Sequence, residues 1–416
     1  MRSNSLVPTV VALAFIAIAP AAQAGHDDDH GRDHDKYSVL EISLPSDANC
    51  LPGFWHATTA RRMNEGGEVV GDDICVIATG DETAPAVIGG SDAFRWHRAS
   101  GATMLPALSA DSFETFAREI NESGAATGVE FRNDGTGVAP LWPRAGGASL
   151  AIEPENCDIF FGVFSQGDGI NDRGDVLAID FRADEVGNCR DTWVLKLASG
   201  EEFVGPRDGV SRQLNNNDVG VGQSRGRAMR WSPATGEVVL YQDPTLQSSA
   251  IAWSINDRNE AVGQITHFDQ ACVATQTAAF WAANAQQTIL TGLLGDTHTW
   301  AFAINNRSEI VGHSFRQPTC EEFDPVLSRA VIWDGTRAVD LNSLVPKRFA
   351  REFQLTVASA INDRGQIVVR GIRRGEPKAP CPRVDFNFET GENFYNDSLT
   401  CQNGYSFLLT PKHDRR

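Results

Sequence analysis

The sequence predicts an all-β fold, a seven-bladed β-propeller with four-stranded antiparallel blades, and three observations support this prediction. A short phrase occurs seven times: an apolar residue, Asn, two or three turn residues and a β run that usually ends in Gly. An apolar stretch that ends near a Trp follows in most repeats. Successive repeat Asn residues are 57, 50, 44, 41, 49 and 57 positions apart. Such uneven spacing suits blades with independent loops better than a solenoid of constant pitch.

The repeat phrase predicts a tight turn between the first two strands of each blade. Its Asn residues are Asn64, Asn121, Asn171, Asn215, Asn256, Asn305 and Asn362. The last turn position requires a positive φ angle, and the residues there are Gly67, Gly124, Gly174, Asp218, Asn259, Ser308 and Gly365. Gly, Asn and Asp tolerate the left-handed region, so Ser308 is the exception.

Each repeat provides four short strands. The first ends at the repeat Asn, the second is the apolar run after it, the third ends near the Trp, and the fourth is a short run such as 238–241. The third strands at 192–195 and 405–408 depart from the Trp pattern, and the seventh repeat lacks a fourth strand. The alternating run 37–44 is expected to supply that strand and to close the ring, which hides open sheet edges.

The N-terminus has the features of an export signal. Arg2 is followed by an apolar run over 7–18 and by the small-residue cleavage site Ala22-Gln23-Ala24. The run is too short for a membrane anchor. We therefore expect a signal peptide at 1–24, a His/Asp-rich tail at 25–36, the propeller at 37–410 and a C-terminal tail at 411–416. The mature protein is predicted to be secreted or periplasmic, monomeric and not inserted in a membrane.

The eight cysteines occur singly and never in a CxxC pair, which favours disulfides over a zinc site in an exported chain. They fall in connections on one predicted face of the ring. Neighbouring positions suggest the pairs Cys50–Cys75, Cys157–Cys189, Cys272–Cys320 and Cys381–Cys401, although other pairings stay open.

The net charge of −18 limits the classes of partner. An acidic surface repels nucleic acid and anionic bilayers, so neither is expected to bind. Polyanionic polysaccharides are disfavoured as well, unless a local basic patch overrides the overall field.

The predicted binding face is the one that carries the connections between second and third strands, because nearly all the length variation lies there. Its polar side chains could form a binding site, or could be solvated loop residues. Trp253 and Trp300 lie on first strands, which line a propeller's channel, so they either pack in the core or stack on a sugar ring. The candidate ligand-binding residues are His267, Asp269, His313, Arg316, Arg373, Arg374, Trp253 and Trp300.

The N-terminal tail contains His26, His30 and His34 among several Asp residues. Such a tract either binds a transition metal weakly or is a solvated acidic tail. No other metal motif occurs, no cofactor is expected, and no catalytic residue is assigned.

The run 360–368, Ala-Ile-Asn-Asp-Arg-Gly-Gln-Ile-Val, resembles the HAF family of extracellular repeats, as do 254–263 and 303–312 with the Trp strands that follow. The resemblance extends from Ala60 to Thr410. It implies a secreted bacterial repeat protein with β-propeller-like repeats, and it brings no catalytic residues. The third strand of repeat three and the turn Asn215-Asn216-Asn217-Asp218 depart from the family pattern.

Two functions follow from these features. The first is a secreted binding or scaffold module that uses its long-loop face to hold an extracellular glycan or protein. The second is a carbohydrate-active enzyme, a polysaccharide lyase or hydrolase, that uses the same face. An enzyme needs His, Arg and Tyr or carboxylates to converge at the channel mouth, whereas a binding module needs only aromatic and scattered polar groups.

Overall fold

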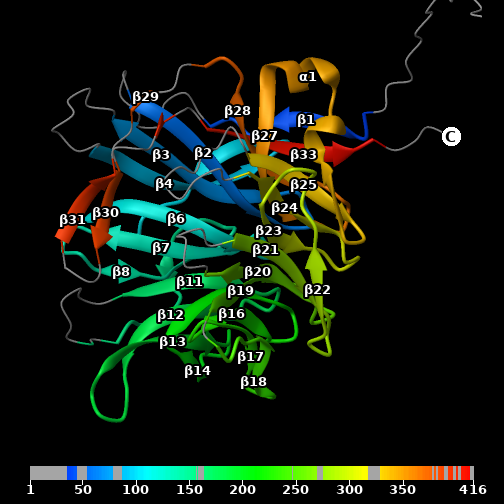
Figure 1. Cartoon of the computed structure of the whole chain (residues 1–416). Coiled ribbons are helices and arrows are strands. Elements are labelled where there is room, and N and C mark those ends of the chain that lie inside the picture. Colours follow the sequence, from blue (N-terminus) through cyan, green and yellow to red (C-terminus); the bar gives the residue numbers. More distant parts are fainter. Residues whose placement is uncertain are drawn as a thin grey trace, which may run out of the picture. The chain divides into compact units, whose positions relative to one another are not determined.

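The computed structural model describes residues 35–44, 54–77, 87–155, 157, 164–245, 247–268, 275–316, 328–376, 379–380, 383–387, 392–396, 400–401 and 404–412. The chain divides into two compact units, residues 1–34 and 35–416, and the described residues belong to the second. This part is nearly all β and is built mainly from four-stranded antiparallel sheets, which is a propeller-like fold (Figure 1).

The first two repeats share one nine-stranded sheet, because a single parallel pairing, Ser91 with Glu114, joins their strands. Its strands are β2 (Phe54–Met63), β3 (Val69–Ile77), β4 (Val87–His97), β5 (Gly101–Met104), β6 (Ser112–Ile120), β7 (Ala126–Arg132), β8 (Gly137–Val138), β9 (Pro140–Trp142) and β10 (Ser149–Leu150).

Each of the next four repeats forms its own sheet with its strands in sequence order. Repeat 3 has β11 (Ser165–Ile170), β12 (Val176–Ala183), β13 (Cys189–Lys196) and β14 (Glu202–Arg207), and repeat 4 has β15 (Gly209–Leu214), β16 (Gly220–Ser224), β17 (Arg227–Ser232) and β18 (Gly236–Tyr241). Repeat 5 has β19 (Ser248–Ile255), β20 (Ala261–His267), β21 (Thr275–Trp281) and β22 (Gln287–Leu290), and repeat 6 has β23 (His298–Ile304), β24 (Ile310–Phe315), β25 (Ser328–Asp334) and β26 (Arg337–Asp340).

The last sheet takes its fourth strand from the start of the described chain. Its order is β27 (Phe353–Ile361), β28 (Ile367–Arg373), β33 (Tyr405–Pro411) and β1 (Tyr37–Glu41). Strand β1 pairs antiparallel with β33 from Tyr37 opposite Pro411 to Glu41 opposite Phe407, as the sequence predicts (Figure 1, blue beside red).

Two connections are more regular than the sequence suggests. Between the second and third strands of repeat 1, pairing continues to Ile77 in β3 and resumes at Val87 in β4. The connection between β28 and β33 contains two small pairs, β29 (Ala379–Pro380) with β32 (Thr400–Cys401) and β30 (Arg383–Asn387) with β31 (Glu392–Asn396). The sequence analysis also missed a 3-10 turn (Leu341–Ser343) and α1 (Lys347–Glu352) before β27.

The Trp residues of the third strands lie in the core. Trp142, Trp193 and Trp281 are completely buried. Their clusters join neighbouring repeats: Trp193 of repeat 3 packs with Leu214 and Trp231 of repeat 4. The last and first repeats are joined in the same way, since Val368 and Leu408 share a cluster with Trp96 and other residues of repeat 1.

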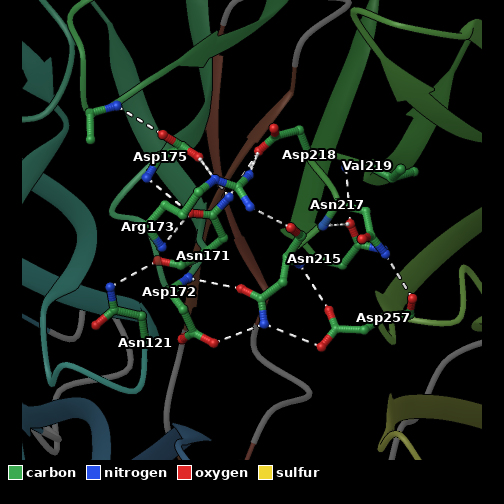
Figure 2. Close-up of polar contacts among 12 residues, drawn as sticks. Asn121, Asn171, Asp172, Arg173, Asp175, Asn215, Asn217, Asp218, Val219 and Asp257 are labelled. Carbon is green, nitrogen blue, oxygen red and sulfur yellow. Dashed lines mark hydrogen bonds and ion pairs between the residues drawn. The ribbon is translucent and has the colours of Figure 1, made fainter.

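The repeat Asn links each turn to the next repeat, which explains why the phrase recurs. Its side-chain Nδ2 donates to the backbone oxygen of the next repeat Asn, for example from Asn121 to Asn171 at 2.8 Å. The bond from Asn362 to Asn64, at 3.3 Å, connects the seventh repeat to the first. The one departure is Asn171, whose Nδ2 donates to the Oδ1 of Asp218, in the turn that departs from the pattern (Figure 2).

A second set of hydrogen bonds runs beside the first. The backbone N–H of the residue after each Asn donates to the side chain at the same position of the next repeat, over 2.6–2.9 Å in all seven cases. Figure 2 shows the section that includes Asp172 and Asp257. The residues in this set are Glu65, Glu122, Asp172, Asn216, Asp257, Asn306 and Asp363. The acidic turn residues therefore already accept hydrogen bonds within the fold.

The turn geometry also follows the sequence. All seven final turn positions have φ between 57° and 85°, including Ser308 at 60°. The Oγ of Ser308 donates to the Oε2 of Glu260 at 2.6 Å, and this hydrogen bond helps to hold Ser308 in the positive-φ conformation.

The predicted disulfide Cys157–Cys189 is present, with Cα atoms 5.8 Å apart. Cys50, Cys272, Cys320 and Cys381 lie outside the described residues, and only the backbone is described for Cys75 and Cys401. None of the described helices is long and apolar enough to span a membrane.

Candidate ligand-binding cavity

The first strand of every repeat carries a β-bulge at the same place. In β2 the pairing register shifts between Ala60 and Arg62, so that Arg61 is the extra residue. Equivalent shifts occur in β6, β11, β15, β19, β23 and β27, each time three residues before the repeat Asn. A bulge redirects a side chain away from the regular alternation of the strand. The seven extra residues, which we call the bulge residues, are Arg61, Arg118, Asp168, Arg212, Trp253, Phe302 and Ser359.

All seven bulge residues line one cavity of about 140 Å³, which we call the small cavity. The first strands are neighbours in chain order, and β27 lies next to β2, so their bulges face a common space. Arg62, Arg370 and Val357 also line it. The sequence of bulge residues puts cationic groups on repeats 1, 2 and 4 and aromatic rings on repeats 5 and 6.

Three polar side chains form a floor below the small cavity. Arg62 is paired with Glu119, with its Nε 3.3 Å from Oε2, and its Nη1 donates to the backbone oxygen of Ser359 at 2.7 Å. Gln213 donates to the same Glu119 carboxylate at 3.1 Å and accepts from the backbone N–H of Ile255 at 2.9 Å. These bonds connect repeats 1, 2, 4, 5 and 7. Beyond them, over the repeat turns, is a separate depression of about 230 Å³.

Two carboxylates, that of Asp168 at the small cavity and that of Asp72, which borders it through Arg61, already have partners. Asp72 is ion-paired with Arg61. Asp168 accepts from the Nε2 of Gln166 at 2.6 Å and from the Oγ of Ser211 at 2.7 Å. These contacts fix the positions of the carboxylates before any ligand enters.

Three guanidinium groups have no such partner. Among the described residues, Arg118, Arg212 and Arg370 show no side-chain hydrogen bond or ion pair, and the Nε of each is buried without an acceptor. Burial lowers the pKa of Arg118 and of Arg370 to about 10, and it lowers that of Arg212 as well. All three are still charged at neutral pH.

An aromatic wall faces the arginines. The rings of Trp253 and Trp300 are stacked with centroids 6.2 Å apart, and Phe302 packs edge-on against both. The guanidinium of Arg212 lies 4.5 Å from the centroid of Trp253, a cation–π contact. Each indole N–H is fixed by a glutamine: Trp253 donates to Gln264 and Trp300 to Gln276.

A second cavity of about 550 Å³, the large cavity, adjoins the small one and shares Thr59, Phe302, Val357 and Arg370 with it. Its other lining residues include Trp300 on the first strand β23, and Phe315, Gly371, Ile372 and Tyr405, which lie where second and third strands are connected. This is the end of the sheets that the sequence analysis selected as the binding face. The volume is within the usual range for small-ligand sites.

His313 also lines the large cavity, in contact with the rings of Trp300 and Phe315. Its Nδ1 is 3.0 Å from the Oγ of Ser328, and its Nε2 is buried and has no partner among the residues that the structure describes. Burial, reinforced by the Arg370 charge, lowers the pKa of His313 to about 3. The imidazole is therefore neutral at physiological pH.

The structure brings together only some of the residues selected from the sequence. Trp253, Trp300 and His313 meet at the two cavities. His267 and Arg316 are exposed and line neither cavity. Arg373 pairs with Glu352 and lies over the Phe353 ring, and Arg374 donates to the backbone oxygen of Ala350, so both are held at α1. Asp269, His26, His30 and His34 lie outside the described residues.

The arginines of the small cavity were missed by the sequence analysis. Their signal is the position three residues before each repeat Asn, which an alignment of the seven phrases would have isolated. The described residues contain no cluster of three or more His, Cys, Asp or Glu side chains that could hold a metal ion.

Comparison with known proteins gives only distant likenesses. No family model and no curated protein matches the chain. Solved structures similar to it include Pyrococcus horikoshii acylaminoacyl peptidase (12% identity, TM-score 0.47, covering 84% of this chain and 52% of that one). Others are a catalytically inactive virginiamycin B lyase from Staphylococcus aureus with quinupristin (8%, 0.46, 90% and 100%) and AofleA from Arthrobotrys oligospora (9%, 0.36, 73% and 88%). The chain spans about half the length of the peptidase. With TM-scores below 0.5, these likenesses support no conclusion about function.

Proposed function

We propose that the chain is an exported, closed seven-bladed β-propeller that binds a ligand in the two adjoining cavities at its long-loop face. The seven bulges carry this proposal, because they turn seven side chains at one repeat position into a common space. A purely structural scaffold has no need to collect unpaired charged groups around an internal cavity, where they cost stability.

Closure of the ring is supported by the contacts between the last and first repeats. Asn362 bonds to Asn64, Asp363 bonds to Glu65, and β27 lies beside β2. Export and membership in the HAF family belong to the same proposal and rest on the N-terminal 24 residues and the repeat phrases.

The favoured ligand is an extracellular glycan, or the end of one, rather than a protein surface. The cavities are concave and of small-ligand size, and the stacked indoles of Trp253 and Trp300 offer faces on which a sugar ring can pack. A protein partner would instead use a broad surface around the loops.

The alternative is a carbohydrate-active enzyme that uses the same cavities. One observation favours it: His313, Arg370 and Tyr405 all line the large cavity. However, a histidine with a pKa of about 3 is a weak base at neutral pH. In addition, burial raises the pKa of Tyr405 above its usual value, so its phenolate is scarce. These pKa shifts make proton transfer by either group unfavourable at neutral pH, so we favour binding.

A glycan array with the mature protein tests the proposal. We expect a defined set of hits that weaken at least tenfold in Trp253→Ala and Trp300→Ala, because each removes a stacking face. The exposed Phe113→Ala variant is the matched control and should bind as the wild type does.

Hits that survive both tryptophan substitutions, or an empty array, would argue against the proposed site. Each hit is then incubated with the protein and its products are separated by mass spectrometry. Cleaved or unsaturated products that disappear in His313→Gln would favour the enzyme alternative.

A further inference from the structure

We propose, on the basis of the binding function above, that the ligand presents a carboxylate attached to a six-membered ring, and that Arg118, Arg212 and Arg370 hold this carboxylate. The glycan or other compound bound in the cavities would thus be an organic acid rather than a neutral molecule. The three arginines are ligand-binding residues in this proposal, and the aromatic wall receives the ring.

The charges at the small cavity leave a positive excess. Five arginines line it, together with one acidic residue, Asp168. Arg61 is neutralised by Asp72 and Arg62 by Glu119. The remaining three guanidinium groups face the single carboxylate of Asp168, whose oxygens already accept from Gln166 and Ser211. The small cavity therefore needs an anionic group to balance its arginines.

The unsatisfied hydrogen-bond donors of the three arginines also indicate an anionic ligand group. A guanidinium has five N–H donors in one plane, and it matches the two oxygens of a carboxylate particularly well. Within the part of the chain that the structure describes, the Nε donors of Arg118, Arg212 and Arg370 are buried and have no acceptor. Buried charged donors are normally paired, because leaving them unsatisfied is costly.

The size of the cavity and its aromatic side indicate a ring. A cavity of about 150 Å³ accepts benzene in another protein, and the small cavity has about 140 Å³. Trp253 and Phe302 line it together with the arginines, and the Arg212 guanidinium lies 4.5 Å from the Trp253 ring centroid. A ring with a carboxylate at one edge would pack against these aromatic side chains and place its charge beside the guanidinium groups. Any longer part of the molecule would extend into the large cavity.

The overall charge limits the ligand further. At a net charge of −18, the molecule repels long polyanions at a distance. A single acid, or a chain that carries its acid at the end, is repelled far less and reaches the local positive field of the cavity. Sugar acids and aromatic acids share this chemistry.

Titration calorimetry separates these sources with four probes at fixed ionic strength: D-glucuronate, D-glucose, benzoate and benzyl alcohol. We expect binding by one or both acids and at least tenfold weaker binding by the neutral compound of the same ring. A response to glucuronate alone identifies a sugar acid, and a response to benzoate alone identifies an aromatic acid. Arg118→Met and Arg212→Met should each reduce the affinity at least tenfold, and the exposed Arg316→Met should not change it.

Thermal unfolding of the unliganded variants provides a second readout. If the arginines serve ligand binding, Arg118→Met should unfold at the same temperature as the wild type or higher, because it removes a buried charge that has no ion pair among the described residues. An arginine with a structural role would lower the midpoint when replaced.

Three results would overturn the inference: no response to either acid at 10 mM, equal binding of the charged and neutral compounds, or unchanged affinity in both arginine variants. If array hits are still lost in Trp253→Ala, the proposed binding function stands and only the acid assignment fails. If no array hit depends on the cavity and no probe binds, the proposed function fails as well.

Discussion

The repeat Asn satisfies several backbone and side-chain groups at once, as Asn305 illustrates. Its Oδ1 accepts from the backbone N–H groups of Arg307 and Glu309 at 3.0 and 2.9 Å. Its Nδ2 donates to Glu309 Oε2 at 2.6 Å and to the Asn362 backbone oxygen at 2.9 Å. Only an amide of this length offers both functions, because Asp lacks the donor and Ser the reach.

Asn305→Asp is therefore expected to be strongly destabilising. It places a second carboxylate beside Glu309 and removes the donor to Asn362, and a buried unpaired group of this kind costs about 3 kcal/mol. Urea unfolding measures the loss. The exposed Asn284→Asp keeps its acceptor for the Gln286 N–H and should change stability by less than about 0.5 kcal/mol. Similar losses in both variants would contradict the role of the repeat Asn.

His313 gives the molecule a specific dependence on pH. Its pKa is about 3 in the fold, against 6.5 for an unperturbed histidine, so the folded state favours neutral imidazole. The resulting stabilisation is fully present above pH 6.5 and is lost as the pH falls toward 3. From pH 7.5 to 5, we expect a loss of about 2 kcal/mol from this group.

The difference in unfolding free energy between wild type and His313→Gln isolates that contribution, since other titrating groups cancel. It should shift by about 2 kcal/mol in favour of the variant between pH 7.5 and 5. A difference that stays constant over this range would mean that His313 titrates normally in the fold.

At the scale of elements, the bulged first strand is the unit that makes the cavity. In β6, Ala117 pairs with Gly128 and Glu119 with Thr127, so that Arg118 is the residue without a partner in the ladder. Deleting Arg118 should restore regular pairing and leave Ala117 in its buried position.

We expect the chain without Arg118 to fold, with a melting temperature within a few degrees of the wild type, since one ladder irregularity is removed. Deletion of Ala117 is the matched control, because it moves Arg118 into the buried site and should prevent folding. Circular dichroism melts distinguish the two. Equal damage from both deletions would show that the bulge is required for the sheet itself.

The sequence predicted the strands better than it predicted the cavity. Turn residues such as Gly67 and Gly365 mark the strand boundaries reliably, because few residues adopt a positive φ there. The bulges have no comparable sequence signal. They also interrupt the alternation of inward and outward residues from which the direction of each side chain would be predicted. Trp253 and Trp300 were selected because they lie on first strands, which line the channel of a propeller. Arg373 and Arg374 are held at α1, a helix that the sequence pattern did not predict.

At the scale of the whole molecule, the first described strand completes the last sheet. Strand β1 covers the edge of β33, and the adjoining segment buries Ile42 against Phe94 and Trp96 of repeat 1. The N-terminal segment thus connects the two ends of the repeat array. This pairing was predictable, because the seventh repeat lacks a strand and the run 37–44 has no repeat of its own.

A chain that begins at residue 45 should be much less stable than one that begins at residue 35. It loses the burial of Tyr37 and Ile42, about 2 kcal/mol each, together with the β1 ladder. It also exposes an edge strand, so concentration-dependent association is expected in sedimentation experiments. Monomeric behaviour and unchanged urea unfolding in the shorter chain would contradict this role for β1.

The bulges have a consequence for how such a protein can change over evolution. A side chain that stands outside the pairing pattern can be exchanged without disturbing the hydrogen bonds on either side of it. Seven such positions, one in each repeat, line the small cavity. Substitutions at these positions could therefore change the side chains that line the cavity one residue at a time, while the turns and the tryptophan core continue to specify the architecture.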